Sequence, residues 1–231
     1  MAIYLHEMIR VVAGREEEYM ASVLSLGSLP GRKRAGGHAE QVGLFRAAEH
    51  SGAAPLVVNL WEHGGWGSLA AALSRQFEDA ERDEAMERWW RANTDLRRGG
   101  EDRVLLPTCY TRDRAALARD GVRGRVFLHE IARTALGGVD AYLERLGETL
   151  LPAAPRLGWQ LVGAYRVAWR PREAVSLWAI EDWPRLGELL SARSSDPRLR
   201  EWFEYRERVV EEVEEALLLP GRMNPLRDPS G

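Results

Sequence analysis

The hydrophobic and polar residues of this chain follow a pattern that occurs twice. Residues 3–10 alternate between apolar and polar side chains, which predicts a strand with one buried face, and residues 126–133 repeat the alternation. The two strands share a motif, since residues 4–7 read Tyr-Leu-His-Glu and residues 127–130 read Phe-Leu-His-Glu. A match that continues over the rest of each copy predicts two homologous halves.

Each of these strands is followed by the same series of predicted elements. A turn at Gly14 or Gly137 leads into a helix, two strands joined by a polar, turn-rich loop follow, and helices and a short apolar strand complete the copy. The later strands are predicted at 42–46, 57–62 and 104–107, and at 162–166, 176–181 and 217–220. This β-α-β-β-α-β order, with its second helical region broken in two, is that of the ferredoxin-like unit.

The last helix of the second copy has a clear start signal. Asp196 is followed by Pro197, and aspartate caps a helix N-terminus while proline fits its first position. The acidic run 209–215 is predicted to form a solvated side of that helix.

The repeat predicts how the chain is organised. The first half spans residues 1–110, a polar, arginine-rich linker spans 111–124, the second half spans 125–222, and residues 223–231 form a frayed tail. A ferredoxin-like unit leaves one apolar face of its antiparallel sheet uncovered. Because the linker is short, we expect the two sheets to close on each other as an intramolecular, pseudo-dimeric α/β barrel of the α+β class. Two independent units are the alternative.

Composition and charge exclude several classes of protein. The formal net charge of −3 provides no field that would attract nucleic acid or an anionic membrane. Cys109 is the only cysteine, which excludes a disulfide framework or a thiolate metal cluster within one chain. The first ten residues lack a signal-peptide pattern, and no apolar run approaches the roughly 18 residues of a membrane helix. We therefore expect a cytoplasmic protein that binds a small molecule, without nucleic-acid or membrane partners.

His6 and His129 are the first candidates for chemistry, because histidine exchanges protons near neutral pH. Strand alternation places His6 and Tyr4 on one face of the strand and Glu7 on the other face. One of the two side chains therefore points between sheet and helices and the other towards the seam of the barrel, and the alternation does not decide which. A shared structural role in both copies is the alternative to acid–base catalysis.

Glu62 and Glu181 end the third predicted strands and are candidates for a general base or a substrate anchor. Solvation or an arginine partner is the structural alternative, since an ionised carboxylate is costly to bury unpaired. Asn59 and Trp61 flank Glu62, whereas Trp178 and Ile180 hold those places in the second copy. If one half is active and the other a scaffold, this is where we expect them to differ, and with Tyr4 these residues are candidates for substrate binding.

The nine tryptophans also bear on the site. A first group falls on apolar helix faces and is predicted to be core: Trp66, Trp89, Trp90, Trp183 and Trp202. A second group lies around the second hairpin and is compatible with either packing or an aromatic-lined pocket for a flat ligand: Trp159, Trp169 and Trp178. Nucleotide-binding glycine motifs, the HExxH zinc motif and the GxSxG nucleophile motif do not occur.

Several of these residues also carry a resemblance to a known family. The Ile3-Tyr4 start, the Gly14 turn, the Tyr19 helix, the Val-Gly-x-aromatic second strand and the Trp61-Glu62 end of the third strand resemble the NIPSNAP-like branch of the dimeric α/β-barrel superfamily. Members of that superfamily include cofactor-free monooxygenases, polyketide cyclases, muconolactone-type isomerases and haem enzymes. Fused two-copy members mimic the dimer within one chain.

The resemblance implies a cofactor-independent enzyme of natural-product metabolism, of the cyclase, isomerase or monooxygenase type. It would bind a flat, apolar or aromatic substrate between sheet and helices and use His/Glu acid–base chemistry, without a metal. Two alternatives stay open, a non-catalytic ligand-binding or scaffold protein with the same barrel, and a haem enzyme. The halves would pair within the chain, and further homodimerisation through the helices is compatible with this arrangement.

Overall fold

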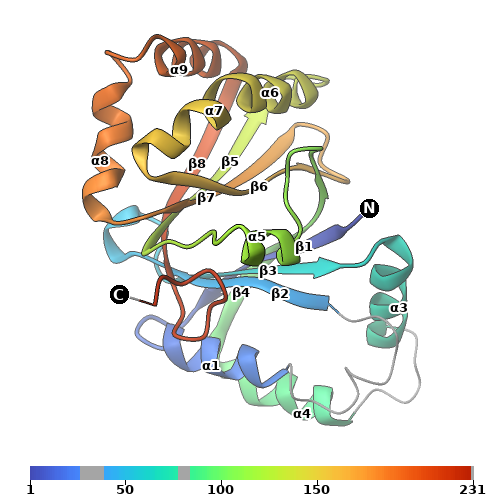
Figure 1. Cartoon of the computed structure of the whole chain (residues 1–231). Helices are drawn as coiled ribbons and strands as arrows, with labels where there is room; N and C mark the ends of the chain where they lie inside the picture. Colours follow the sequence, from blue (N-terminus) through green and yellow to red (C-terminus); the bar gives the residue numbers. More distant parts are fainter. Residues whose placement is uncertain (27–38, 78–83, 230–231) are drawn as a thin grey trace.

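A closed barrel of eight antiparallel strands forms the centre of the molecule (Figure 1). The computed structural model describes residues 1–26, 39–77 and 84–229. The strands of the first half are β1 (Ile3–Val11), β2 (Ala39–Ala47), β3 (Leu56–His63) and β4 (Arg97–Pro107). Those of the second half are β5 (Val126–Thr134), β6 (Trp159–Val167), β7 (Glu173–Ile180) and β8 (Val210–Pro220).

The helices cover the barrel from two opposite sides, below it for the first half in Figure 1 and above it for the second. The first set is α1 (Glu16–Leu26), α3 (Trp66–Phe77) and α4 (Glu84–Asn93), with the short turns η1 (Glu49–Ser51) and η2 (Thr94–Leu96). The second set is α6 (Val139–Arg145), η3 (Leu146–Leu150), α7 (Leu151–Ala153), η4 (Ala154–Leu157), α8 (Trp183–Ala192) and α9 (Pro197–Val209). A short helix between the halves, α5 (Arg114–Arg119), lies within the segment predicted to be a linker.

The strand order β1-β3-β2-β8-β5-β7-β6-β4 shows how the halves join. Each half contributes a four-stranded sheet, and the two sheets meet edge to edge at β2–β8 and at β4–β6. Each seam pairs three residues of one strand with three of the other, which gives every strand of the barrel two neighbours. The predicted intramolecular barrel is confirmed, and the alternative of two independent units is wrong.

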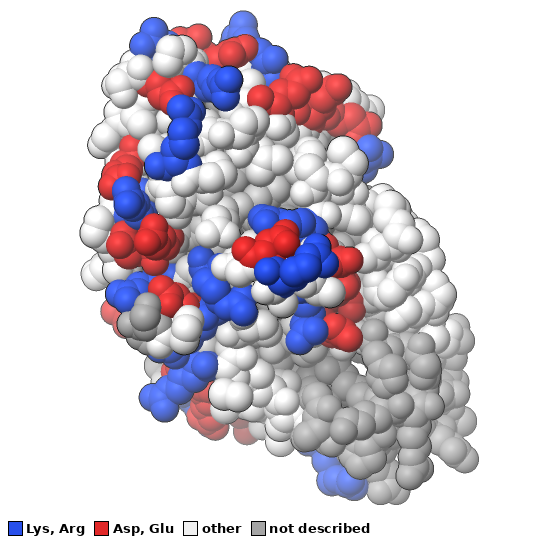
Figure 2. All heavy atoms as spheres, viewed as in Figure 1, with Lys and Arg blue, Asp and Glu red and all other residues white. Residues whose placement is uncertain are grey.

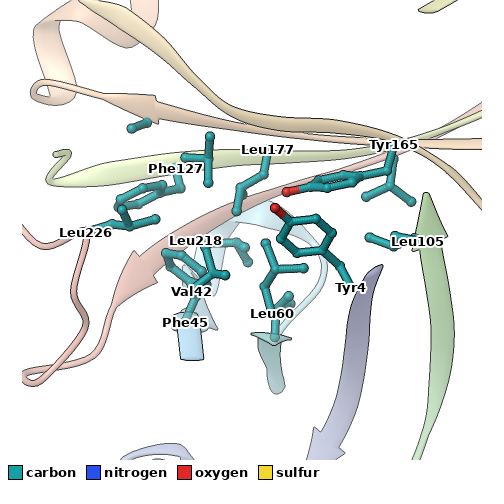
Figure 3. Packing of buried hydrophobic residues seen from close by; sticks show 14 of the residues in the cluster. Tyr4, Val42, Phe45, Leu60, Leu105, Phe127, Tyr165, Leu177, Leu218 and Leu226 are labelled. Atoms are coloured by element: carbon teal, nitrogen blue, oxygen red, sulfur yellow. The ribbon is translucent and has the colours of Figure 1, made fainter. Parts of the chain in front are cut away.

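The interior of the barrel is filled by side chains from both sheets (Figure 3). Tyr4 packs against Tyr165 with ring centroids 5.0 Å apart, and Phe45 packs against Phe127 at 4.8 Å. All four are at most 1% exposed. Burying an aromatic or large aliphatic side chain contributes about 1.5–3 kcal/mol, so this shared core strongly favours the closed form over separated halves.

The Val-Gly-x-aromatic motif of the second strands has a packing cause. At both glycines the register of the strand shifts, which marks a bulge in β2 and in β6. The aromatic ring two residues later lies over the glycine: a Cβ atom at Gly163 would come 2.0 Å from the Tyr165 hydroxyl oxygen, and one at Gly43 would come 2.4 Å from the Phe45 ring. The missing side chain is therefore what allows each ring to fold over its own strand into the barrel.

Two sequence predictions differ from the structure. The last strand of each half is longer than its apolar run, because β4 begins at Arg97 and β8 at Val210. The acidic run predicted as a helix side is thus an exposed stretch of strand, and helix α9 ends at Val209. The start of α9 is as predicted, with the Asp196 carboxylate accepting hydrogen bonds from the backbone N–H groups of Arg198 and Leu199.

The predicted tryptophan core is right in part. Trp89 and Trp202 are buried, but Trp66 and Trp183 are 48% and 50% exposed and Trp90 is 37% exposed. Trp66 and Trp183 begin α3 and α8, where a helix protrudes past the sheet that it covers. Helical periodicity identifies a face but does not tell how far along the helix the covering sheet extends.

The packing of Tyr165 over Gly163 gives a stability prediction. Gly163→Ala should lower the free energy of unfolding by about 1–3 kcal/mol, because the new methyl group overpacks a ring held on all sides. Gly187→Ala is the control, since that glycine lies on the exposed side of α8 with no atom near the new methyl group. There alanine should stabilise the helix by up to about 1 kcal/mol. Urea unfolding of both variants measures the difference, and equal effects would contradict the packing argument.

Candidate functional site

A cavity of about 490 Å³ lies between the sheet and the helices of the second half. Most of its wall is apolar, and aromatic rings come from β6, β7 and α9: Trp159, Trp178, Trp202 and Phe203. Ser51 from η1 also lines it, so the first half contributes to the site of the second. The size and lining are those of a pocket for a small, largely apolar ligand.

The carboxyl group of Glu130 stands in the wall of this cavity, and the residue is only 7% exposed. The Tyr142 hydroxyl of α6 donates a hydrogen bond to its Oε1 atom at 2.5 Å. Arg206 of α9 approaches its Oε2 atom to 2.8 Å. Strand alternation in β5 directs Glu130 towards the helices, and these two helical side chains hold it in place.

The chemistry of Glu130 follows from its surroundings. Burial raises the pKa of the carboxyl group above its ordinary value, whereas Arg206 and the Tyr142 hydroxyl act in the opposite direction. A hydrogen bond with the neighbouring Glu215 also raises the pKa. Burial likewise raises the pKa of Tyr142, so its phenol stays protonated as a donor. A carboxyl group with a raised pKa in an apolar pocket is suited to take and return a proton near neutral pH.

The helix above Glu130 is irregular. Between α6 and α7 the chain makes a π-helical turn, η3, and Leu146 and Leu150 of this turn line the cavity. The wider turn adds a residue to the helix, and such bulges are frequent at functional sites.

The corresponding region of the first half has different hydrogen bonds. Glu7 accepts hydrogen bonds from the indole N–H of Trp61 at 2.7 Å and from the side-chain amide of Asn59 at 3.2 Å. In the second half the same strand positions hold Ser176 and Trp178, and Trp178 donates to the Ser176 hydroxyl at 3.2 Å instead. Trp178 therefore leaves Glu130 to its helical partners and to the cavity. The sequence comparison matched Asn59 and Trp61 with Trp178 and Ile180, and this correspondence is wrong by two residues. The strand register matches them with Ser176 and Trp178, so the halves differ at Asn59 and Ser176 and both have tryptophan at the other position.

His6 and His129 lie inside the barrel, on the face away from the helices. Their Nε2 atoms are 3.0 Å apart, and the rings are stacked with a centroid distance of 4.9 Å. Equivalent residues of two halves can meet in this way only near the pseudo-twofold axis that relates them. Neither residue is among those that line the cavity, so this arrangement supports the structural role.

Burial also determines the protonation of this pair. It lowers the pKa of His129 to about 3 and that of His6 well below its ordinary value, and the nearby Arg103 guanidinium acts in the same direction on both. Both rings are therefore neutral near neutral pH, and one donates its N–H to the other.

The remaining predicted site residues fall into two places. Tyr4 lies in the barrel core and donates to the Glu62 carboxylate at 2.8 Å, and Glu62 also accepts from the backbone N–H of Arg114 at 2.8 Å. Glu181 is exposed beyond the end of β7 and pairs with Arg185 at 3.7 Å. Neither carboxylate lines the second-half cavity, and of the predicted substrate-binding residues only Trp178 does so.

The residues around the second-half cavity bear on the haem alternative. No histidine is among the residues that line the second-half cavity, so an axial imidazole ligand is missing from that described wall. The described ranges also contain no group of three or more histidine, cysteine or acidic residues that could hold a metal ion. Nor do they contain a helix long and apolar enough to cross a membrane.

The charges on the surface are mixed in sign. On the face shown in Figure 2, arginine and acidic side chains are interspersed. Many of them form ion pairs, such as Arg114 with Glu40 and Arg133 with Glu212.

Solved structures with the same fold span nearly all of the chain. An anthrone oxidase-like protein has a TM-score of 0.65 and 8% identity, covering 97% of this chain and 93% of its own. A "putative monooxygenase" from Lactobacillus acidophilus has a TM-score of 0.61 and 10% identity, covering 95% and 93%. At these identities the likeness establishes the shared fold.

Single-copy proteins match one half. A NIPSNAP family protein of unknown function from Agrobacterium tumefaciens is 22% identical over 45% of this chain and 95% of its own, with a TM-score of 0.40. A "putative monooxygenase" and a NIPSNAP family protein are thus both among the solved structures that resemble this chain. No protein-family model matches the chain, and no curated protein matches it.

Sequence reasoning missed the residues that surround Glu130. The glutamate itself stands in the repeated motif, but alternation alone could not tell its face from that of His129. Tyr142 recurs in the repeat as the counterpart of Tyr19, which is a usable signal. Arg206 lies in helix α9 and Glu215 in strand β8. The acidic run spans the boundary between them, so the sequence pattern did not show where the helix ends.

The histidine pair gives a prediction about pH and stability. Because both folded-state pKa values lie below the unfolded value, stability is complete above about pH 6.5 and is lost as the pH falls. From pH 7 to pH 5 each histidine should cost about 2 kcal/mol of unfolding free energy. His6→Gln/His129→Gln should lack this component, whereas His50→Gln, at an exposed position, should keep it.

Urea unfolding at several pH values measures this difference. Imidazole NMR of the wild-type protein provides a second check on the two buried histidines. Titration of His6 and His129 above pH 6 would contradict the buried neutral pair.

Proposed function

We propose that the chain is a cofactor-independent enzyme of the monooxygenase type that acts on a flat aromatic small molecule in the second-half cavity. The observation that carries this proposal is Glu130, a buried carboxyl group with a raised pKa in the wall of a pocket lined by aromatic rings. The names of the similar full-length structures, a monooxygenase and an anthrone oxidase-like protein, support the choice of reaction class.

The proposed reaction begins with proton abstraction by Glu130. A carbon between aromatic rings and opposite a carbonyl group loses its proton to the carboxylate, and the electron pair spreads over the ring system as an enolate. The Arg206 guanidinium stabilises the resulting negative charge, and the apolar wall keeps water from returning the proton. The electron-rich carbon of the bound substrate can then react with dioxygen.

The overall reaction balances without a cofactor. The CH₂ group of an anthrone and one O₂ molecule yield the C=O group of an anthraquinone and one water molecule. The four electrons come from the substrate and reduce dioxygen. The protein contributes the base, the positive charge and a dry, flat chamber.

The proposal places the site in the second half only. In the first half, Glu7 is held by two N–H donors, from Asn59 and Trp61, and burial raises its pKa as well. The difference is that Glu130 lines the second-half cavity and Glu7 does not. The first half then serves to close the barrel and to supply Ser51 to the pocket.

The test uses 1,8-dihydroxyanthrone as a probe. The wild-type protein should accelerate formation of the quinone and consumption of oxygen over the protein-free rate. Glu130→Gln should reduce this acceleration by roughly 10²-fold or more, since a positioned base contributes that much. Glu7→Gln, the same change at the pseudo-symmetric position, should leave it nearly unchanged.

The pH profile has a definite sign. Because the carboxylate is the active form, kcat/KM should rise with pH through the pKa of Glu130, which lies above that of an ordinary glutamate. Quenching of tryptophan fluorescence measures probe binding separately, and it should persist in Glu130→Gln. Binding with no turnover in the wild-type protein would favour a ligand-binding protein, and equal loss in both glutamine variants would contradict a second-half site.

A further inference from the structure

We propose that Glu215 is a proton-relay residue that takes the abstracted proton from Glu130 and releases it to solvent. This inference rests on the proposed function and assigns a task to a residue outside the repeated motif. Each turnover leaves a proton on Glu130, and a carboxyl group enclosed under helices needs a route for losing it.

The register of the barrel brings the two carboxyl groups together. Glu130 of β5 and Glu215 of β8 are directly opposite each other in the antiparallel pair, so their side chains project from the same face. Arg206 contacts both carboxyl groups through one nitrogen. Its Nη2 atom lies 2.8 Å from Oε2 of Glu130 and 2.5 Å from Oε1 of Glu215. The two oxygens can therefore be no farther apart than these two distances combined.

The two groups differ in their access to water. The Glu130 side chain is 9% exposed, the Arg206 side chain 17% and the Glu215 side chain 43%. Both glutamates line the cavity, with Glu215 at its solvent end. Exposure thus increases along the line from the buried base to the surface, as a proton exit requires.

Arg206 also explains why two acids can share this place. Two carboxylates side by side repel each other, and one of them then holds its proton more tightly. The guanidinium offsets part of that repulsion, so the pair can hold one proton that moves between them. The other group that faces Glu130, the Tyr142 hydroxyl, donates its own proton in a hydrogen bond and leaves the Glu215 side open.

The relay balances in protons and charge when the second oxygen atom of dioxygen leaves the substrate as hydroxide. The proton released to solvent neutralises this hydroxide, and together they give the one water molecule of the overall reaction. After substrate deprotonation, Glu130 is a neutral acid and Glu215 a carboxylate. The proton passes from the first to the second, which restores the Glu130 base, and Glu215 then gives it to water or to a buffer base. No bond to carbon changes, and no electron is transferred.

The test compares Glu215→Gln with Glu211→Gln, a control on the same strand that is exposed and paired with Arg172. With 1,8-dihydroxyanthrone, Glu215→Gln should complete a first turnover at the wild-type rate. Its steady-state rate should then fall roughly ten-fold or more. Added formate or imidazole should restore that rate, which a merely structural role would not produce, and Glu211→Gln should behave as wild type.

The outcomes separate the relay from the proposed function. If Glu130→Gln is inactive and Glu215→Gln keeps the full steady-state rate, the relay is wrong and the base remains. If neither variant changes turnover, the proposed function is wrong as well.

A second measurement is independent of turnover. In ¹³C-carboxyl NMR, Glu215→Gln should lower the titration midpoint of Glu130, because it removes the neighbouring negative charge. An unchanged midpoint would overturn the coupling on which the relay depends.

Discussion

Mutual burial of two apolar sheet faces is the constraint on which the rest of this structure depends. Each ferredoxin-like half has helices on one face of its sheet only, and the bare face of one half is the cover of the other. Tyr4 and Phe45 of the first half meet Tyr165 and Phe127 of the second across this interface. The seams β2–β8 and β4–β6 then complete the backbone pairing, so the two halves are one folding unit rather than two.

This closure determines where a ligand can bind. The barrel interior is filled with side chains, and His6 and His129 meet there across the pseudo-twofold axis. A cavity lies between sheet and helices, and Leu146 and Leu150 of the π-helical turn η3 form part of its wall. Residues on the inner side of a strand therefore serve the fold, and residues on the outer side face the pocket.

Duplication within one chain allows the two halves to differ. In a homodimer both sites would carry the same residues, but here Asn59 and Ser176 occupy equivalent strand positions with different hydrogen-bonding groups. The indole of Trp61 is bound to Glu7, whereas the indole of Trp178 is bound to Ser176. With Ser176 at the position of Asn59, the indole N–H of Trp178 donates to the serine hydroxyl and not to the glutamate. Glu130 is then left with Tyr142, Arg206 and Glu215 as its neighbours.

The sequence by itself determined the duplication, the order of strands and helices in each half and the closed barrel, because periodicity and repetition are properties of local sequence. The pairing of Asn59 with Ser176 came only from the strand register, because the sequence comparison of the third strands was two residues out of step. Only the tertiary structure decided that His6 and His129 face the seam while Glu7 and Glu130 face the helices, because strand alternation is symmetric until one face is assigned to the core. The partners of Glu130 come from α6, α9 and β8, far apart in sequence, and only the packing of those elements brings them to one carboxyl group.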